Sequence, residues 1–420
     1  MAAPSQKPSA FRVALQKNYG LYTAGSTISL FGMWAHKLAA AWLAWDLTES
    51  SFWVGAVAFS ELIPTLILTP FAGVLAERYN RLRLTMISQI CGMLQSCALG
   101  WMVLTGKFSD YDDVYWLIGW TAFLGIVWSV NTAARLSVVP NLVTREDVPS
   151  AVAMNSAIFN LARVIGPAMG GWMIAVWGVG EAFLFNSVTY IFFIAALIFI
   201  RPVRDDRRPA SGVGVFMQAA DGIRYAARHP GIGPMLVLLT AMAIGGKSLL
   251  ELMPEFADHV FDVGKVGLGY LTATAGAGGL VAAIWLTARG RVEGLTGITI
   301  AALLASATAV FAFVATDWFP VALAAVFLLG VTGICGGTTT QTLMQHAVDE
   351  SVRGRVMSLY GMIHRGAPAL GALAMGALAE LTGIRVAVAM GGVFCIAVWI
   401  WMAPKTGRLR DILEAEKPGG

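Results

Sequence analysis

Charged side chains are scarce in this sequence of 420 residues. Asp, Glu, Lys and Arg together make up 13% of it, about half the share found in soluble domains, whereas hydrophobic residues make up 57%. A soluble fold of this length has no room to bury so many helices that are apolar on every side. The composition therefore excludes a soluble globular protein and indicates a chain that lies within a membrane.

Cysteine is rare as well, and the four cysteines all fall within apolar stretches. No Cys-x-x-Cys pair is present, so the sequence indicates neither a disulfide framework nor a zinc site. Residues 1–18 lack the short apolar core and the cleavage site of a signal peptide. We therefore expect the first apolar stretch to remain in the mature protein.

Common sequence motifs of enzymes are missing too. Neither H-E-x-x-H nor G-x-S-x-G occurs. The stretch AMAIGGKS at 241–248 matches a relaxed nucleotide-binding pattern, but that motif works only in a loop between a strand and a helix. Here it lies inside an apolar stretch, so we interpret it as a chance match. We expect no enzyme activity, no cofactor and no metal site.

What the sequence does contain is a series of apolar stretches, each long enough to cross a bilayer. A spanning helix needs roughly 20 apolar residues, and we identify twelve candidates. They are 19–46, 52–75, 83–104, 114–135, 150–177, 182–200, 232–256, 267–288, 295–316, 318–342, 355–381 and 386–403. The predicted fold class is an all-α membrane protein with twelve transmembrane helices.

A polar segment at 201–231 divides these spans six and six. It opens with the charge run RPVRDDRRP and continues with GVFMQAADGIRYAARH, in which apolar and small residues recur at helical spacing. We expect an amphipathic helix that lies at the inner membrane surface and tethers the two halves. The predicted domains are an N-terminal six-helix bundle, a cytoplasmic linker, a C-terminal six-helix bundle and a cytoplasmic tail, at 1–200, 201–231, 232–404 and 405–420.

The distribution of Lys and Arg predicts the orientation, because cytoplasmic loops carry an excess of these residues. If the N-terminus is cytoplasmic, most of the 29 basic residues fall in inner segments. The outer loops then hold Lys107, Lys265 and Arg385 and carry the acidic run Asp110, Asp112, Asp113. We expect both termini to be cytoplasmic, and the net charge of +4 to report topology, with no nucleic-acid partner.

The break after the second span resembles a motif of the major facilitator superfamily. GVLAERYNRLR, at 73–83, is similar to the loop 2–3 motif G-x-L-a-D-R-x-G-R-R of that superfamily. The resemblance implies a cytoplasmic gate formed by Gly73, Glu77, Arg78 and Arg81. Glu77 stands for the usual aspartate and Asn80 for the usual glycine, so we expect the local geometry to depart from the motif.

The fifth span carries a second resemblance. GPAMGG at 166–171 is similar to the helix 5 motif of antiporters in the same superfamily, and Arg163 precedes it by one turn. Small residues allow helices to touch closely and a proline permits a bend. The antiporter-like motif residues are Arg163, Gly166, Pro167, Gly170 and Gly171. A purely structural packing role is the alternative.

The related sequence MIHRGAPALGA in the eleventh span indicates that the two halves of the chain repeat.

Longer stretches resemble one bacterial branch of the superfamily, which contains enterobactin-type siderophore exporters and multidrug exporters. They are AWLAWDLTESSFWVG, LSVVPNLVTREDVPSAVAMNSAIFNLARVIGPAMGG, EFADHVFDVGKVGLGYL and RGRVMSLYGM. The resemblance implies two pseudo-symmetric bundles that move by alternating access in the cytoplasmic (inner) membrane. It implies a monomeric secondary transporter, a proton-coupled antiporter that exports a small amphipathic or anionic molecule. An importer, or a transport-inactive sensor on the same fold, is the alternative.

Ionisable residues inside the spans are the main candidates for function. A charged side chain at the centre of a spanning helix costs about 3 kcal/mol on insertion scales, so such residues are expected to face protein or a wet cavity. Glu61 and Glu251 are the proton-coupling candidates, because a carboxylate that opens to either side can load and release a proton. A permanent ion pair between Lys37 and Glu61 is the other interpretation.

The resemblance also implies which residues contact the substrate. Helices 1, 4, 7 and 10 line the cavity in the superfamily, which gives five candidates in these spans: Lys37, Trp128, Asn131, Lys247 and Gln341. Cations outnumber acids within the spans, which favours an anionic or catecholate-like substrate over a lipophilic cation.

Overall fold

Helices make up most of the described part of the chain, and no strand occurs in it. The computed structural model describes residues 13, 15–201, 223–350 and 352–415. Within these ranges the apolar stretches of the sequence become helices whose ends lie within a few residues of the predicted limits. The predicted all-α fold class is therefore confirmed.

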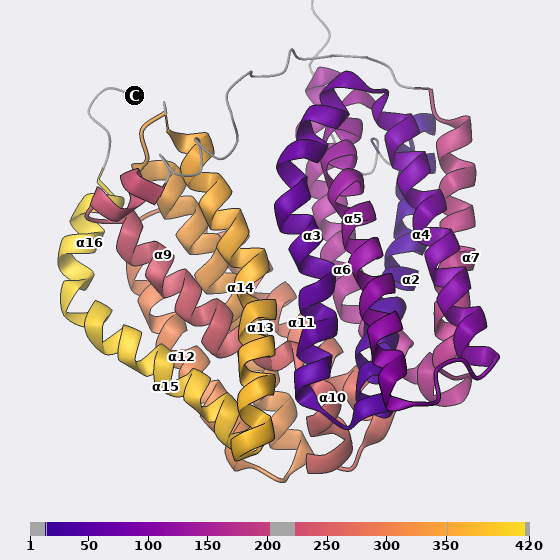
Figure 1. The fold of residues 1–420 in the computed structure, drawn as a ribbon. Helices are drawn as coiled ribbons and strands as arrows, with labels where there is room; N and C mark the ends of the chain where they lie inside the picture. The colour runs from indigo at the N-terminus through magenta and orange to yellow at the C-terminus, as the bar shows by residue number, and fades with distance from the viewer. Residues whose placement is uncertain (1–12, 14, 202–222, 351, 416–420) are drawn as a thin grey trace, which may run out of the picture. The chain divides into compact units, whose positions relative to one another are not determined.

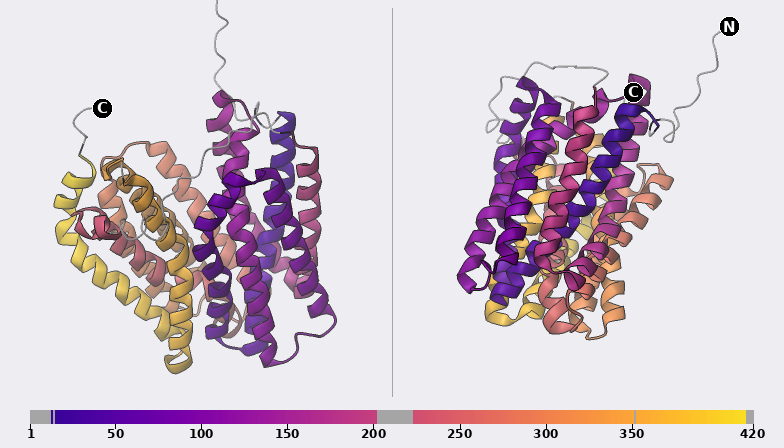
Figure 2. Two further views of the ribbon diagram at one scale, coloured as in Figure 1. Left: turned by 45° about the horizontal axis from the view of Figure 1, so that its top comes forward. Right: turned by 90° about the vertical axis from the view of Figure 1, so that its right-hand side faces the viewer.

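Six long helices form the N-terminal half (Figure 1). They are α2 (Lys17–Thr48), α3 (Ser51–Arg78), α4 (Arg81–Leu104), α5 (Val114–Val138), α6 (Val148–Val176) and α7 (Val179–Phe199). In this half α4 packs against both α5 and α7. Figure 2 shows the same helices, indigo to magenta, from two further directions.

The C-terminal half contains five long helices, one broken span and a short terminal helix. The long ones are α11 (Gly264–Arg289), α12 (Leu295–Ala315), α13 (Phe319–Ala347), α14 (Arg353–Thr382) and α15 (Ile384–Met402), and the short one is α16 (Thr406–Leu413). In this half α13 packs against α11 and α12, and α12 also packs against α15. The predicted tail at 405–420 therefore includes a helix that hydropathy alone does not indicate.

The span predicted at 232–256 is not one continuous α-helix. It consists of α9 (Ile232–Ala241), a π-helical turn η4 (Met242–Gly246), a 3-10 turn η5 (Lys247–Glu251) and the short α10 (Met253–Glu255). Another π-helical turn, η6 (Phe256–Val260), follows. Glycines at 245 and 246 and Pro254, which lacks a backbone N–H, weaken α-helical hydrogen bonding along this stretch.

Ten helical segments of the described chain are long and apolar enough to cross a membrane. α2 and α14 are 32 and 30 residues long but are not among the ten. Both carry basic and histidine residues along their length, Lys37 and His36 in α2 and His364 and Arg365 in α14. Twelve spans are consistent with this count, since α2 and α14 are long enough to cross a membrane and are interrupted by these polar side chains.

The chain divides into two compact units, and the division does not fall at the linker alone. One unit comprises the described residues of 1–40 and 63–211, and the other those of 41–62 and 212–420. The end of α2 and the start of α3 thus group with the C-terminal half. The predicted bundles at 1–200 and 232–404 stay predictions.

Candidate functional site

The broken span of the C-terminal half places Lys247 at the start of the 3-10 turn η5. Its Nζ lies 3.4 Å from Nε2 of His364 in α14. An ammonium group can only donate hydrogen bonds, so in this contact the histidine accepts through an unprotonated Nε2. Lys247 and His364, which lie far apart in the sequence, are thus brought together inside one unit.

Aromatic stacking and close packing hold this pair. The Tyr360 ring stacks on His364 with centroids 5.3 Å apart, and the Tyr360 hydroxyl donates to the Gly337 carbonyl at 3.1 Å. A Cβ at Gly337 would lie 2.7 Å from His364 Cε1, and one at Gly333 would lie 3.3 Å from Lys247 Cε. Two glycines of α13 therefore leave the space that both side chains occupy.

The same break changes the position expected for Glu251. Residues four apart lie about 40° apart around an α-helix but about 120° apart around a 3-10 helix. Lys247 and Glu251 are the two ends of the 3-10 turn, and both side chains are half-buried. In a continuous α-helix these two residues would share one face, but the 3-10 turn turns their side chains apart. The role of Glu251 in proton coupling stays a prediction.

Lys37 and Glu61 lie in different units. Lys37 is exposed on α2 in the first unit, and Glu61 is half-buried on α3 within the segment that groups with the second. Their predicted pairing and the predicted coupling role of Glu61 stay predictions.

Buried polar side chains link α2, α4 and α7 in the first unit. Ser96 Oγ lies 3.2 Å from Nδ1 of His36, and the Asn186 amide donates to Ser96 Oγ at 2.9 Å. The second ring nitrogen of His36 is buried with no hydrogen-bond partner among the described residues. Hydrogen bonds of this kind tie spanning helices together.

Two of the predicted cavity residues lie on α5, and they differ in burial. Asn131 is buried, and its side-chain oxygen accepts a hydrogen bond from the Gln89 amide of α4 at 3.1 Å. Trp128 is half-buried, as is Gln341 on α13. The amide of Asn131 thus joins two helices here, while substrate contact by all three stays a prediction.

Arg135 forms a contact that the sequence reasoning missed. Its guanidinium donates to Tyr22 Oη at 3.1 Å and to Ser26 Oγ at 2.7 Å, both on α2. It also lies over the Phe193 ring of α7, 5.3 Å from the centroid. Its partners are hydroxyl and aromatic groups whose positions no sequence spacing reveals.

The helix 5 motif brings α6 and α2 into close contact. Pro167 lies inside α6, and Gly166, Gly170 and Gly171 are buried. A Cβ at Gly166 would lie 2.6 Å from Trp34 Cβ, and one at Gly170 would lie 2.9 Å from the Ala35 backbone. Arg163 lies over the Phe159 ring of its own helix at 5.2 Å. The predicted close packing is confirmed, and the role in antiport stays a prediction.

The loop 2–3 motif spans the end of α3 and the start of α4. Arg81 begins α4, and Asn80 caps it by accepting a hydrogen bond from the Arg83 N–H at 3.1 Å. Asn80 has a φ of −65°, so its backbone conformation does not require glycine, and the expected departure from the motif's geometry stays a prediction. Gly73, Glu77 and Arg78 belong to the last turns of α3. Their predicted gate contacts lie outside the described side chains.

A further polar cluster, here called the α2–α3 turn cluster, lies within the second unit. It comprises Trp45, Ser50, Ser51, Glu255, Asp258 and Glu380. The Trp45 N–H donates to Asp258 at 3.0 Å, and the Ser51 and Ser50 hydroxyls donate to Glu255 and Glu380, respectively. These bonds join the turn between α2 and α3 to the broken span and to α14, which explains why 41–62 group with the C-terminal half.

Comparisons with known proteins agree with this architecture. Residues 11–415 match the family described as transmembrane secretion effector. The chain is 25% identical to the staphyloferrin A transporter of Staphylococcus aureus, over 90% of this chain and 94% of that protein. It is also 25% identical to the multidrug efflux pump Tap of Mycolicibacterium fortuitum, over 91% and 93%.

A further relative is the enterobactin exporter EntS of Escherichia coli O1:K1, which is 24% identical over 78% of this chain and 77% of its own length. Among solved structures, the nucleoside transporter NupG has a TM-score of 0.71 at 11% identity, covering 92% of this chain and 98% of that chain. This structural likeness shows the fold alone. The protein is a multi-pass membrane transporter and belongs to the transmembrane secretion effector family of the major facilitator superfamily.

Proposed function

We propose that this protein is a proton-coupled antiporter that exports a small anionic or amphipathic molecule, such as a siderophore-like metabolite. The observation that carries the proposal is the break in the span at 232–256, which holds Lys247 beside His364. Irregular backbone within a spanning segment is tolerated where protein or a wet cavity surrounds it. In transporters, binding sites often lie at such interrupted helices.

The nature of this pair favours an anionic substrate. Lys247 and His364 are both nitrogen bases, and both can carry positive charge. A charged side chain within a spanning segment costs on the order of 3 kcal/mol. An anionic group beside both side chains would offset that cost, whereas a cationic substrate would add to it.

Proton coupling is assigned to the two carboxylates within the spans, Glu61 and Glu251. Both are half-buried. A carboxyl group exposed to each side of the membrane in turn can bind a proton on one side and release it on the other. Glu251 ends the same 3-10 turn that begins with Lys247, so its protonation would change the charge close to the proposed substrate site.

Import is the second candidate direction, because importers and exporters share this architecture. The exporter and efflux names of two relatives favour export. A transport-inactive sensor on the same fold is the third candidate, and it predicts no solute flux at all.

The distribution of basic residues favours a cytoplasmic membrane location with both termini cytoplasmic, and we expect a monomer.

The experiment compares Lys247→Gln with Lys107→Gln, an exposed control in the loop after α4. Uptake of enterobactin and of the cationic dye ethidium is measured in everted vesicles. Loss of a hydrogen bond to a charged group costs about 1.5–3 kcal/mol, so enterobactin transport should fall at least about tenfold in Lys247→Gln and stay unchanged in Lys107→Gln. Transport of ethidium alone, insensitive to both changes, would contradict the proposal.

A further inference from the structure

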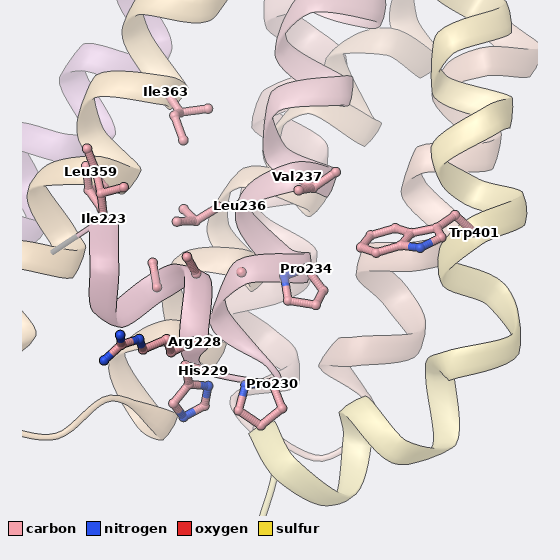
Figure 3. Close-up of a pocket in the computed structure, with 13 residues that line it drawn as sticks. Ile223, Arg228, His229, Pro230, Pro234, Leu236, Val237, Leu359, Ile363 and Trp401 are labelled. Atoms are coloured by element: carbon pink, nitrogen blue, oxygen red, sulfur yellow. The ribbon is translucent and has the colours of Figure 1, made fainter.

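A groove lies in the second unit beside the start of α9 (Figure 3). Its volume is about 590 Å³. Its walls come from the helical stretch 223–228, α9, α14 and α15, and they are mainly apolar. Figure 3 places Trp401 of α15 on one side and Leu359 and Ile363 of α14 on the other, with Leu236 and Val237 of α9 between them. We call it the linker groove.

Packing holds the linker groove in shape. Ala226 is buried, and a Cβ at Gly233 would lie 2.8 Å from the Ala226 carbonyl oxygen. The Tyr225 hydroxyl donates to Asp349 at 3.1 Å. His229 Nδ1 accepts from the backbone N–H groups of Gly231 and Ile232 at 3.1 and 3.2 Å, which caps α9. The groove is therefore preformed, since each flanking segment is fixed by its own contacts.

The linker groove lies at the level of a membrane surface. Span 7 begins at Ile232, next to the groove, and Trp401 is the second-last residue of α15. Tryptophan favours the boundary between lipid tails and headgroups. Val237 is 43% exposed and Trp401 44% exposed, so the apolar wall is open on the side where lipid tails lie.

Positive charge lies at the mouth of the groove. Arg228 lines it and is exposed, and the Lys405 Nζ lies 3.6 Å from the centroid of the Trp401 ring. Burial lowers the pKa of His229, with Asp349 acting in the opposite direction. The cationic groups at neutral pH are therefore Arg228 and Lys405, and no carboxylate is among the described residues that line the groove.

We propose that the linker groove binds one anionic phospholipid. The phosphate-bearing headgroup lies against Arg228 and Lys405, and an acyl chain lies along Leu236, Val237 and Ile363. A lipid fits better than a water-soluble anion, because most of the lining is apolar and opens toward the membrane interior. The lipid would fix the linker helix to α9, α14 and α15. This inference is independent of the identity of the transported solute.

The test uses the purified full-length protein, stripped of lipid and titrated with phosphatidylglycerol or with phosphatidylcholine of the same acyl chains. Bound lipid is counted by native mass spectrometry. Arg228→Ala removes the headgroup contact. Ala227→Trp fills the groove, because Ala227 is an exposed residue that lines it. Arg224→Ala is the matched control, because Arg224 is exposed on the same helical stretch but does not line the groove.

We expect one phosphatidylglycerol to bind in preference to phosphatidylcholine. Each basic residue near an anionic lipid surface contributes about 1 kcal/mol, so Arg228→Ala should weaken binding about fivefold. Ala227→Trp should abolish it, and Arg224→Ala should leave it within about twofold. Equal binding of the two lipids would overturn the anionic specificity. Equal effects of the two arginine variants, or full binding by a folded Ala227→Trp protein, would overturn the site.

Discussion

Single charged residues within the spans dominate the chemistry available to this protein. A carboxylate in a membrane helix is costly unless it is protonated, paired or wet. Glu61 is half-buried on α3, and Glu251 ends the 3-10 turn of the broken span. A carboxylate that is protonated in one state and ionised in another is a candidate for coupling proton movement to solute transport. Substitution by glutamine, which has the same shape and no charge, tests that role.

Glu61→Gln tests this at the scale of one residue. Glutamine keeps the shape and cannot exchange a proton, so transport driven by a proton gradient should fall at least tenfold, while counterflow exchange of solute continues. Glu293→Gln, in the exposed loop before α12, is the control. Gradient-driven transport at the wild-type rate in Glu61→Gln would remove Glu61 from the coupling mechanism.

The roles of individual polar residues were the least predictable from sequence. The resemblance implied that Asn131 lies on a cavity-lining helix, and it did not indicate the hydrogen bond that Asn131 accepts from Gln89 of the neighbouring helix. Asn80 was expected to disturb the loop 2–3 motif, yet it caps α4. The partners of Arg135 lie more than 50 residues away in the chain. Such pairings depend on helix rotation and packing, which hydropathy does not encode.

At the scale of whole elements, the short helix α16 illustrates how the chain end stabilises the C-terminal half. Leu409 and Leu413 are buried. Glu414, the residue that follows α16, accepts hydrogen bonds from the backbone N–H groups of Gly294 and Thr296 at 2.6 and 2.8 Å. It therefore satisfies the exposed donors at the start of α12, where negative charge is also favoured by the helix dipole.

Glu414→Gln should weaken this contact in a pH-dependent way. Burial acts to raise the pKa of Glu414, but the hydrogen bonds from Gly294 and Thr296, together with the nearby Arg410, lower it below the usual 4.5. A lowered pKa stabilises the fold above pH 4.5, and this contribution is lost as the pH falls through the folded-state pKa. At pH 7 we expect a loss of about 1 kcal/mol, seen as a lower melting temperature in detergent.

The control for this change is Asp411→Asn, an exposed carboxylate on α16 itself. The difference between Glu414→Gln and the wild type should shrink as the pH falls below about 4.5. A difference that is constant with pH, or equal to that of Asp411→Asn, would mean that the charge of Glu414 contributes nothing to the cap.

Element positions were largely predictable, because a bilayer demands long apolar helices and hydropathy reports them directly. The limits of α4, α12 and α14 lie within two or three residues of the expected ones. The break at 242–251 was not predicted, since hydropathy does not distinguish an α-helix from a π or 3-10 turn. The glycines at 245 and 246 and Pro254 were the available signal. α16 is too short and polar to register as a span.

At the scale of the whole molecule, the α2–α3 turn cluster bears on how the halves move. If residues 1–200 rock against 232–420, as the proposed alternating access requires, Ser51 would separate from Glu255, to which it is hydrogen-bonded here. The sequence repeat indicated two halves, but it could not indicate that 41–62 group with the second. Hydroxyl–carboxylate bonds between residues more than 200 positions apart join this segment to the second half.

Crosslinking this contact should therefore stop transport. We expect Ser51→Cys/Glu255→Cys, joined by a short thiol crosslinker in a background without the four native cysteines, to lose export at least tenfold, and a cleavable linker to restore it on reduction. The uncrosslinked double variant is the control. Full export by the crosslinked protein would mean that the turn between α2 and α3 stays with the C-terminal half throughout the cycle.

The central claim is that solute movement is driven by protons through this one chain. Its most direct test is the purified protein in proteoliposomes, with an imposed pH gradient and enterobactin as the solute. We predict accumulation of enterobactin above its equilibrium level when the interior is acidic, with release when a protonophore collapses the gradient. Uptake that only equilibrates and ignores the pH gradient, or no flux beyond protein-free vesicles, would contradict the account.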